Sequence, residues 1–165
     1  SDDRTPFVTG TSARDSLFMD REFMERCLAL AERAAERGEV PVGAVVVRDG
    51  VVIGEGRNRC EELRDATAHA ELEALRGAFV TASEGRLAGA TLYCSLEPCF
   101  MCAGAALHAR VARIVFAARD PKFGACGSLA MIPADPRVNH RCPVDEGLLA
   151  ERSAVLLRTF FRERR

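Results

Sequence analysis

The chain has 165 residues, of which 48% are hydrophobic and 28% are charged, and its formal net charge is −1 at pH 7. These values are typical of a single globular domain, and no apolar run of about 18 residues predicts a membrane-spanning helix. The polar first residues have no apolar segment behind a basic start, which argues against a secretory signal and favours a cytoplasmic protein.

The N-terminal part of the chain predicts a leader followed by a long helix. Residues 1–18 show no convincing periodicity and predict a flexible leader before one domain over residues 19–165. Asp20 can cap a helix that runs to about Arg37, and Gly38 is a suitable stop.

A hairpin and a second helix are expected next. Two β-branched runs surround Asp49-Gly50, a strong signal for a two-residue turn, and predict a β-hairpin over residues 43–56. Thr67 can cap a helix over residues 68–79.

The second half of the chain alternates between strand and helix patterns. Pro98 suits the first turn of a helix that ends at about Ala109. The other expected elements are two strands, a short third strand inside a Gly-, Pro- and Asp-rich loop, and a closing helix: residues 91–96, 113–118, 138–142 and 148–164. A hairpin followed by β-α-β units predicts an α/β fold with a mixed sheet covered by helices on both faces.

Two short motifs contain residue types that bind zinc. His69-Ala70-Glu71 is followed 27 residues later by the motif that begins at Pro98 and contains Cys99 and Cys102. The two cysteines are three residues apart at a helix start, so both thiols face one side, where the helix dipole favours thiolates. Two thiolates and an imidazole fill three corners of a tetrahedral zinc site and leave the fourth open for water, as in catalytic sites.

Other interpretations of these motifs are weaker. A Cys-x-x-Cys pair alone is also typical of redox sites, and a lone histidine is usually structural. A structural zinc would need a fourth ligand with similar spacing, whereas His108 and His140 stand alone in unlike contexts. We therefore expect one catalytic zinc per chain. Glu71 is better suited to shuttle protons between water and a substrate than to bind the metal or to serve only the helix dipole.

Positive charge is concentrated at the C-terminal end. Residues 108–165 contain 11 basic and 6 acidic side chains, whereas acidic residues outnumber basic ones in the rest of the chain. An uneven solvated surface would also give this pattern, but a polyanion could dock on such an end. We expect Lys122, Arg162, Arg164 and Arg165 to lie near phosphates.

Together these motifs match the signature of zinc-dependent base deaminases. From about Met24 to the C-terminus the chain resembles bacterial tRNA-specific adenosine deaminases. The resemblance is carried by the two zinc motifs and by segments around them: GEGRNR, DATAHAELEALR, TLYCSLEPCFMCAGAALHARV, RIVFAARDPKFGACGSL and NHR.

The resemblance implies a three-layer α/β/α sandwich with a five-stranded mixed sheet, a homodimer, and zinc held by His69, Cys99 and Cys102. It implies hydrolysis of adenosine to inosine at the wobble position of an anticodon, in an arginine tRNA, with Glu71 as the acid and base. The residues expected to bind the tRNA anticodon stem-loop are Asn58, Ala70, Asp120, Lys122, Phe160, Phe161 and Arg162.

Structural roles remain open for several of these residues. Asn58 and Asp120 could satisfy turns, and the C-terminal arginines could be an ordinary solvated end. Phe160 and Phe161 point in different directions on a helix, so one of them could pack in the core. The chain also departs from the family pattern at Ala66, Phe100 and Cys126, which affects the expected pocket wall.

Two other functions compete with tRNA editing. A deaminase of free bases or nucleosides, of the guanine or cytosine type, would share the zinc motifs but would not need the ARD-x-K loop or the basic last helix. A non-catalytic RNA-binding subunit would have no use for Glu71.

Overall fold

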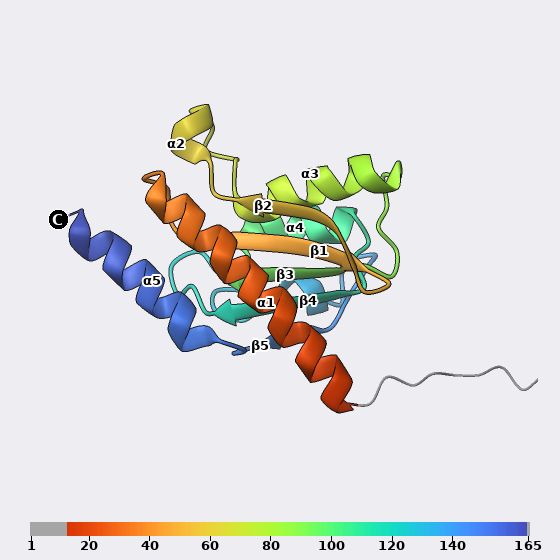
Figure 1. Ribbon diagram of the computed structural model, residues 1–165. Coiled ribbons are helices and arrows are strands. Elements are labelled where there is room, and N and C mark those ends of the chain that lie inside the picture. Colours follow the sequence, from red (N-terminus) through yellow and green to blue (C-terminus); the bar gives the residue numbers. More distant parts are fainter. Residues whose placement is uncertain (1–12, 165) are drawn as a thin grey trace, which may run out of the picture.

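The computed structural model describes residues 13–164, which form a twisted sheet between two layers of helices (Figure 1). The sheet has the strand order β2-β1-β3-β4-β5. Strand β1 is antiparallel to β2 and β3, whereas β3, β4 and β5 are parallel, which confirms the expected five-stranded mixed sheet. The strands are β1 Gly43–Arg48, β2 Val51–Arg57, β3 Thr91–Leu96, β4 Arg113–Ala118 and β5 Val144–Glu146.

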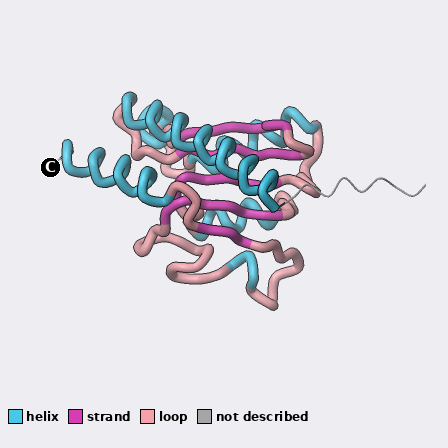
Figure 2. The backbone as a smooth tube through the Cα atoms, turned by 60° about the horizontal axis from the view of Figure 1, so that its bottom comes forward, coloured by secondary structure: helices cyan, strands magenta, loops and turns pink. Residues whose placement is uncertain are grey.

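Each face of the sheet has its own pair of long helices. Helices α1 (Ala13–Glu36) and α5 (Ala150–Glu163) cover one face, and α3 (Ala70–Ala82) and α4 (Phe100–His108) cover the other, as Figures 1 and 2 show. A short helix α2 (Cys60–Leu63) and a 3₁₀ turn η1 (Ile132–Ala134) lie in the connections. The larger core lies on the α3–α4 side and the smaller one under α1, so the three-layer sandwich is confirmed.

The β1–β2 hairpin has the turn that its sequence predicts. Asp49 and Gly50 both have positive φ, 54° and 75°, as a two-residue turn between strands of normal twist requires.

Two glycines in β2 allow α3 to lie unusually close to the sheet. A Cβ atom at Gly54 would lie 2.1 Å from the carbonyl oxygen of Ala74, and one at Gly56 would lie 2.4 Å from that of Ala70. Any side chain at either position would therefore push away the helix whose first turn contains Ala70 and Glu71.

Several expectations about element ends are wrong. Helix α1 begins at Ala13, so residues 13–18 are helical, and the rest of the expected leader lies outside the described residues. Asp20 therefore lies inside the helix, where its carboxylate accepts hydrogen bonds from Arg113 and Tyr93. Thr67 bonds to Asp65, and His69 occupies the N-cap position of α3.

The last strand also differs from expectation. It spans Val144–Glu146 and pairs with β4, whereas residues 138–142 form no strand. Pro98 precedes α4 by two residues and is not in its first turn. Among residues 13–164, no helix is long and apolar enough to cross a membrane.

Candidate functional site

The residues of the two zinc motifs meet at the starts of two helices on one face of the sheet. His69 is the N-cap residue of α3, and Cys99 is the N-cap residue of α4. Their ligand atoms and the Cys102 sulfur all lie within 4.8 Å of one another. The fold thus brings together three donors that are 30 and 3 residues apart in sequence.

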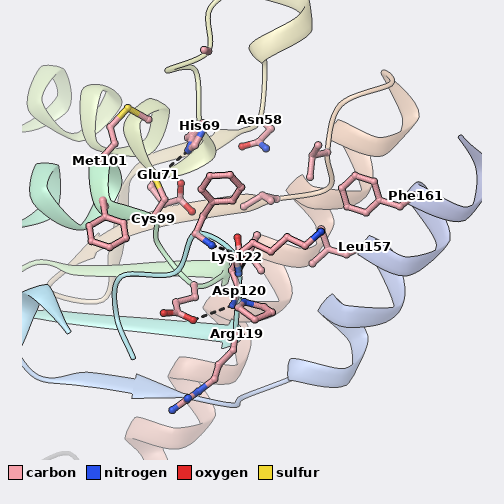
Figure 3. A pocket seen from close by; sticks show the side chains of 18 residues that line it. Asn58, His69, Glu71, Cys99, Met101, Arg119, Asp120, Lys122, Leu157 and Phe161 are labelled. Carbon is pink, nitrogen blue, oxygen red and sulfur yellow. Dashed lines mark hydrogen bonds between the residues drawn. The ribbon is translucent and has the colours of Figure 1, made fainter. Parts of the chain in front are cut away.

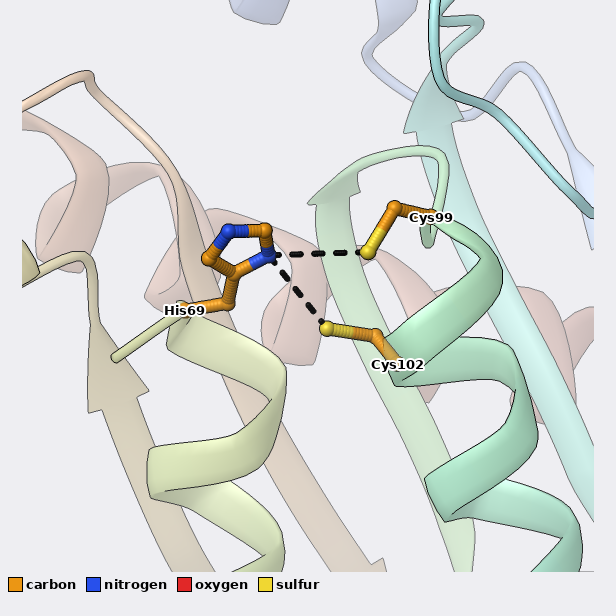
Figure 4. Close-up of side chains that lie close together, drawn as sticks. All are labelled: His69, Cys99 and Cys102. Atoms are coloured by element: carbon orange, nitrogen blue, oxygen red, sulfur yellow. Dashed lines mark hydrogen bonds between the residues drawn. The ribbon is translucent and has the colours of Figure 1, made fainter. Parts of the chain in front are cut away.

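The geometry of these three donors fits a zinc ion. His69 Nδ1 lies 3.6 Å from Cys99 Sγ and 3.5 Å from Cys102 Sγ (Figure 4). A tetrahedral zinc with bonds of about 2.0 Å to nitrogen and about 2.3 Å to sulfur separates such atoms by about 3.5 Å.

The protonation of the two thiols is also informative. Hydrogen bonds from the Cys102 thiol and His69 lower the pKa of Cys99 to about 4. The Cys99 thiolate and burial raise the pKa of Cys102 well above its usual value. Two thiolates this close repel each other, so a divalent cation is the group that allows both to ionise.

Glu71 lies beside two of the three donors in the wall of a cavity. Its side chain is 4% exposed and lines a cavity of about 810 Å³, together with His69 and Cys99. Burial raises the pKa of Glu71, against a hydrogen bond from Cys102 that lowers it. A carboxyl group is thus held in the cavity wall next to His69 and Cys99.

Asn58 lies at the end of β2 and also lines this cavity. Its Oδ1 accepts a hydrogen bond of 2.9 Å from the Ala70 amide, which fixes the orientation of the side chain. The Asn58 amide NH₂ group then remains as a donor for a ligand. Ala70 itself is fully buried in the core and does not line the cavity, so its expected contact with substrate is not supported.

The loop after β4 forms the opposite wall of the cavity. Asp120, Lys122 and Phe123 all line it. Asp120 Oδ1 accepts the amides of Lys122 at 3.0 Å and Phe123 at 3.3 Å, so Asp120 also has the turn role left open by its sequence context. Figure 3 shows the Lys122 side chain extending towards Leu157 and Phe161 of α5.

The two phenylalanines of α5 have different environments. Phe161 is 49% exposed and lines the cavity, whereas Phe160 is 6% exposed and does not. The rings pack edge to face, 5.3 Å apart, and the Arg164 guanidinium covers Phe160 at 3.8 Å. The expected RNA contact of Phe160 is therefore not supported, because its buried ring packs against Phe161 and Arg164.

A basic depression continues from the cavity along α5. Arg162 and Arg164 line it, together with Lys122, Arg158, Leu157 and Phe161. Arg158 is paired with Glu151, but Lys122, Arg162 and Arg164 form no salt bridge with other side chains of residues 16–164. The expected phosphate contact of Arg165 falls outside the described residues.

The positions that depart from the family pattern are also placed. Ala66 and Phe100 line the cavity, and Phe100 is 50% exposed at its mouth. Cys126 is fully buried and does not line the cavity.

The sequence motifs missed one buried residue of this wall, Glu97. Burial alone would raise its pKa, but hydrogen bonds from Ser128, Asp120 and Cys126 outweigh that effect and lower it. An acidic residue between an apolar strand and a metal ligand was a signal that could have identified it.

Comparison with known proteins identifies relatives along most of the chain. Residues 18–118 match the family model described as the cytidine and deoxycytidylate deaminase zinc-binding region. The tRNA-specific adenosine deaminase of Agrobacterium fabrum is 48% identical over 143 residues, covering 87% of this chain and 94% of that protein.

Two solved structures are informative. One, from a study of A-to-I editing by tRNA:A34 deaminases at the wobble position, is 46% identical, with a TM-score of 0.79 over 82% of this chain and 99% of that one. A guanine deaminase from Nitrosomonas europaea is 27% identical, with a TM-score of 0.70 over 85% of this chain and 83% of that one.

Proposed function

Because this chain belongs to the zinc-binding deaminase family, and within it to the tRNA-specific adenosine deaminases, we propose that it hydrolyses adenosine to inosine at the wobble position of a tRNA anticodon. The observation that carries the proposal is that the cavity lined by His69, Glu71 and Cys99 shares three lining residues with the basic depression along α5: Lys122, Leu157 and Phe161. A free base would use only the inner part of this cavity.

His69, Cys99 and Cys102 would hold one zinc ion. A zinc ion in such a site makes water acidic enough to act as a nucleophile at neutral pH. Glu71 takes a proton from the attacking water and delivers it to N1 of adenine as the oxygen adds to C6. Glu71 then carries the second proton to the amino group, the C6–N bond breaks, and ammonia leaves. Adenosine and water give inosine and ammonia, with no redox change.

The rest of the cavity positions the nucleotide. The Asn58 amide donates to the nucleoside, and Phe161 offers an exposed aromatic face on which a splayed base of the loop can stack. Lys122 and Arg162 face the phosphates, whose charge they complement. A loop base needs no unpairing before it enters the cavity, which keeps the cost of capture low.

The experiment compares substrates on the purified chain. Inosine should form in an anticodon stem-loop with adenosine at the wobble position, at a much higher kcat/KM than with free adenosine, guanine or cytosine. Preference for a free base would contradict tRNA editing and favour the base-deaminase alternative. Among tRNAs we propose the arginine tRNA, and stem-loops with other anticodons test that choice.

We also propose a cytoplasmic homodimer. All seven cysteines are free thiols, which fits a reducing compartment. Two large apolar side chains in the loop after β4, Leu129 and Met131, are 56% and 42% exposed and lie outside the cavity lining, and a second copy could cover them. Light scattering of the purified chain should give twice the monomer mass of 17.9 kDa.

A further inference from the structure

Glu97 is the most highly bonded carboxylate in the cavity wall, although it has no place in the reaction described above. It follows β3 and precedes Pro98 and Cys99, and only 2% of it is exposed. Its Oε1 accepts the Asp120 amide at 3.0 Å and the Ser128 hydroxyl. Its Oε2 accepts the amides of Cys126 at 3.0 Å and Ser128 at 2.9 Å.

All four donors come from one loop, residues 120–128, which wraps around the carboxylate. The fit is so close that a Cβ atom at Gly124 would lie 2.2–2.4 Å from the Glu97 carboxyl atoms. The residues that follow Glu97 also hold the loop: the Ala125 amide donates to Pro98 oxygen at 2.9 Å, and Cys99 forms a β-bridge with Gly124.

An ionised glutamate is well suited to this position. Its two oxygens provide about four acceptor sites and no donor, which matches four inward-pointing N–H and O–H groups. Hydrogen bonds to a charged acceptor are also stronger than those between neutral groups. A glutamine would place its NH₂ group where one carboxylate oxygen accepts two of these donors, so at least one backbone amide would lose its acceptor.

The same loop carries three side chains of the cavity wall, Asp120, Lys122 and Phe123. Its anchor, Glu97, is two residues from the metal ligand Cys99. The loop that faces the RNA and the helix that starts at the metal are therefore fixed to one short segment.

We propose that Glu97 is a positioning residue that holds residues 120–128 in the conformation that binds RNA beside the target nucleotide. This inference rests on the proposed function, because it assigns the loop to RNA. Glu97 touches neither the substrate nor the metal and acts through Asp120, Lys122 and Phe123. Its loss should weaken RNA capture more than the chemical step.

The test is Glu97→Gln in the full chain, studied by hydrogen exchange and steady-state kinetics. Amide exchange at Asp120, Cys126 and Ser128 should accelerate at least about tenfold, because hydrogen bonds to a buried charge are strong. KM for an anticodon stem-loop should rise about tenfold, the change expected for about 1.4 kcal/mol of lost binding. The zinc content and the kcat on saturating RNA should stay close to those of the wild type.

Glu39→Gln is the matched control. Glu39 is equally buried and accepts the amides of Glu61 and Glu62 at 2.8 and 3.2 Å, at the start of α2. Its loss should accelerate exchange at those two amides and leave residues 120–128 protected. If Glu97→Gln accelerated exchange at Glu61 and Glu62 as well as in residues 120–128, the variant would be destabilised generally and the specific role of Glu97 would be overturned.

Ser128→Ala provides a milder test should Glu97→Gln fail to fold. It removes one donor and keeps the carboxylate, so exchange and KM should change in the same direction by a smaller factor. Unchanged loop exchange and KM in the variant that folds would overturn the proposal, as would a loss of zinc with unchanged KM. Should the wild type fail to deaminate the stem-loop, the proposed function would be wrong, whereas loop exchange would still decide whether Glu97 positions the loop.

Discussion

At the scale of single residues, we propose that chemistry and positioning are divided between two buried glutamates. Glu71 and Glu97 are 4% and 2% exposed, and both border the same cavity. Glu97 is surrounded by four donors, which keep it an acceptor. Glu71 lies beside the zinc ligands and accepts fewer hydrogen bonds than Glu97. A proton shuttle must be able to exchange its partners, so the less bonded carboxylate is the one that suits catalysis.

Replacement of Glu71 by Gln should abolish most turnover while the site stays assembled. The loss of a general acid and base typically reduces kcat by about 100- to 10,000-fold. Zinc content by elemental analysis and stem-loop affinity should remain near wild type, because Glu71 is neither a metal ligand nor a phosphate contact. Near-normal turnover in a zinc-loaded variant would contradict the assignment.

Asp20 should contribute to stability through its bonds with Arg113 and Tyr93. Burial raises the pKa of Asp20, but the bonds from Arg113 and Tyr93 outweigh it and lower the pKa. Asp20→Asn should reduce the free energy of unfolding at pH 7 by about 1.5–3 kcal/mol, the usual value for hydrogen bonds to a charged group.

The pH dependence of this effect follows from the lowered pKa. The stabilisation by Asp20 is complete above about pH 4 and is lost as the pH falls through the folded-state pKa. Urea denaturation should therefore show a difference between wild type and Asp20→Asn at pH 7 that shrinks towards pH 3. An equal difference at both pH values would show that the charge of Asp20 is not the cause.

At the scale of elements, local signals predicted what local interactions determine. The Asp49-Gly50 turn and strands 91–96 and 113–118 were correct because turn geometry and β-branched runs specify them. The start of α1 and strand β5 were missed. Asp20 pairs with Arg113, which is 93 residues away, and Val144 pairs with Ile114 across the sheet, so neither contact is visible in a local pattern.

The sequence likewise predicted part of the site: the metal ligands were correct, whereas the roles of Phe160 and Glu97 were not predicted. Zinc ligands have a fixed spacing and chemistry, and the structure brings His69, Cys99 and Cys102 together as expected. The packing role of Phe160 depends on the rotation of α5 against the sheet, which the helix sequence does not specify. The four bonds of Glu97 depend on the path of a loop that begins 23 residues later.

Helix α5 and the loop after β4 should together provide the electrostatic part of RNA binding. Each lost phosphate contact on a single-stranded segment reduces the slope of log affinity against log salt by about 0.7. The double variant Lys122→Gln, Arg162→Gln should therefore lower that slope by about 1.4 in stem-loop binding titrations. Arg86→Gln, at the exposed residue beyond the far end of α3, should leave the slope unchanged. An unchanged slope in the double variant would remove these two residues from the RNA site.

At the scale of the whole molecule, the metal connects helices from separate parts of the chain. His69 is the N-cap residue of α3 and Cys99 that of α4, so a zinc ion would cross-link two helices that pack on one face of the sheet. Zinc binding is then coupled to folding, because the unfolded chain does not keep these three donors together.

Removal of zinc should lower the stability of the whole domain. A ligand present at 1,000 times its Kd stabilises the folded state by about 4 kcal/mol. A strong chelator should shift the urea midpoint downwards, and elemental analysis before chelation should find one zinc per chain. Cys102→Ser should abolish both the metal and the shift, whereas Cys60→Ser, outside the cluster, should preserve both. If chelation left the urea midpoint of zinc-loaded protein unchanged, zinc would not cross-link α3 and α4 in a way that stabilises the domain.

The shortness of β5 has a consequence for heating. This edge strand has three residues, and it is the connection from the sheet to α5, which carries Phe161 and Arg162. Short edge elements open at lower free energy than central strands. We therefore expect warming to release α5 before the sheet melts, so that activity on tRNA is lost at a lower temperature than the amide-exchange protection of the central strands. The upper temperature limit of the enzyme would then be set by the loss of tRNA binding and not by unfolding of the sheet.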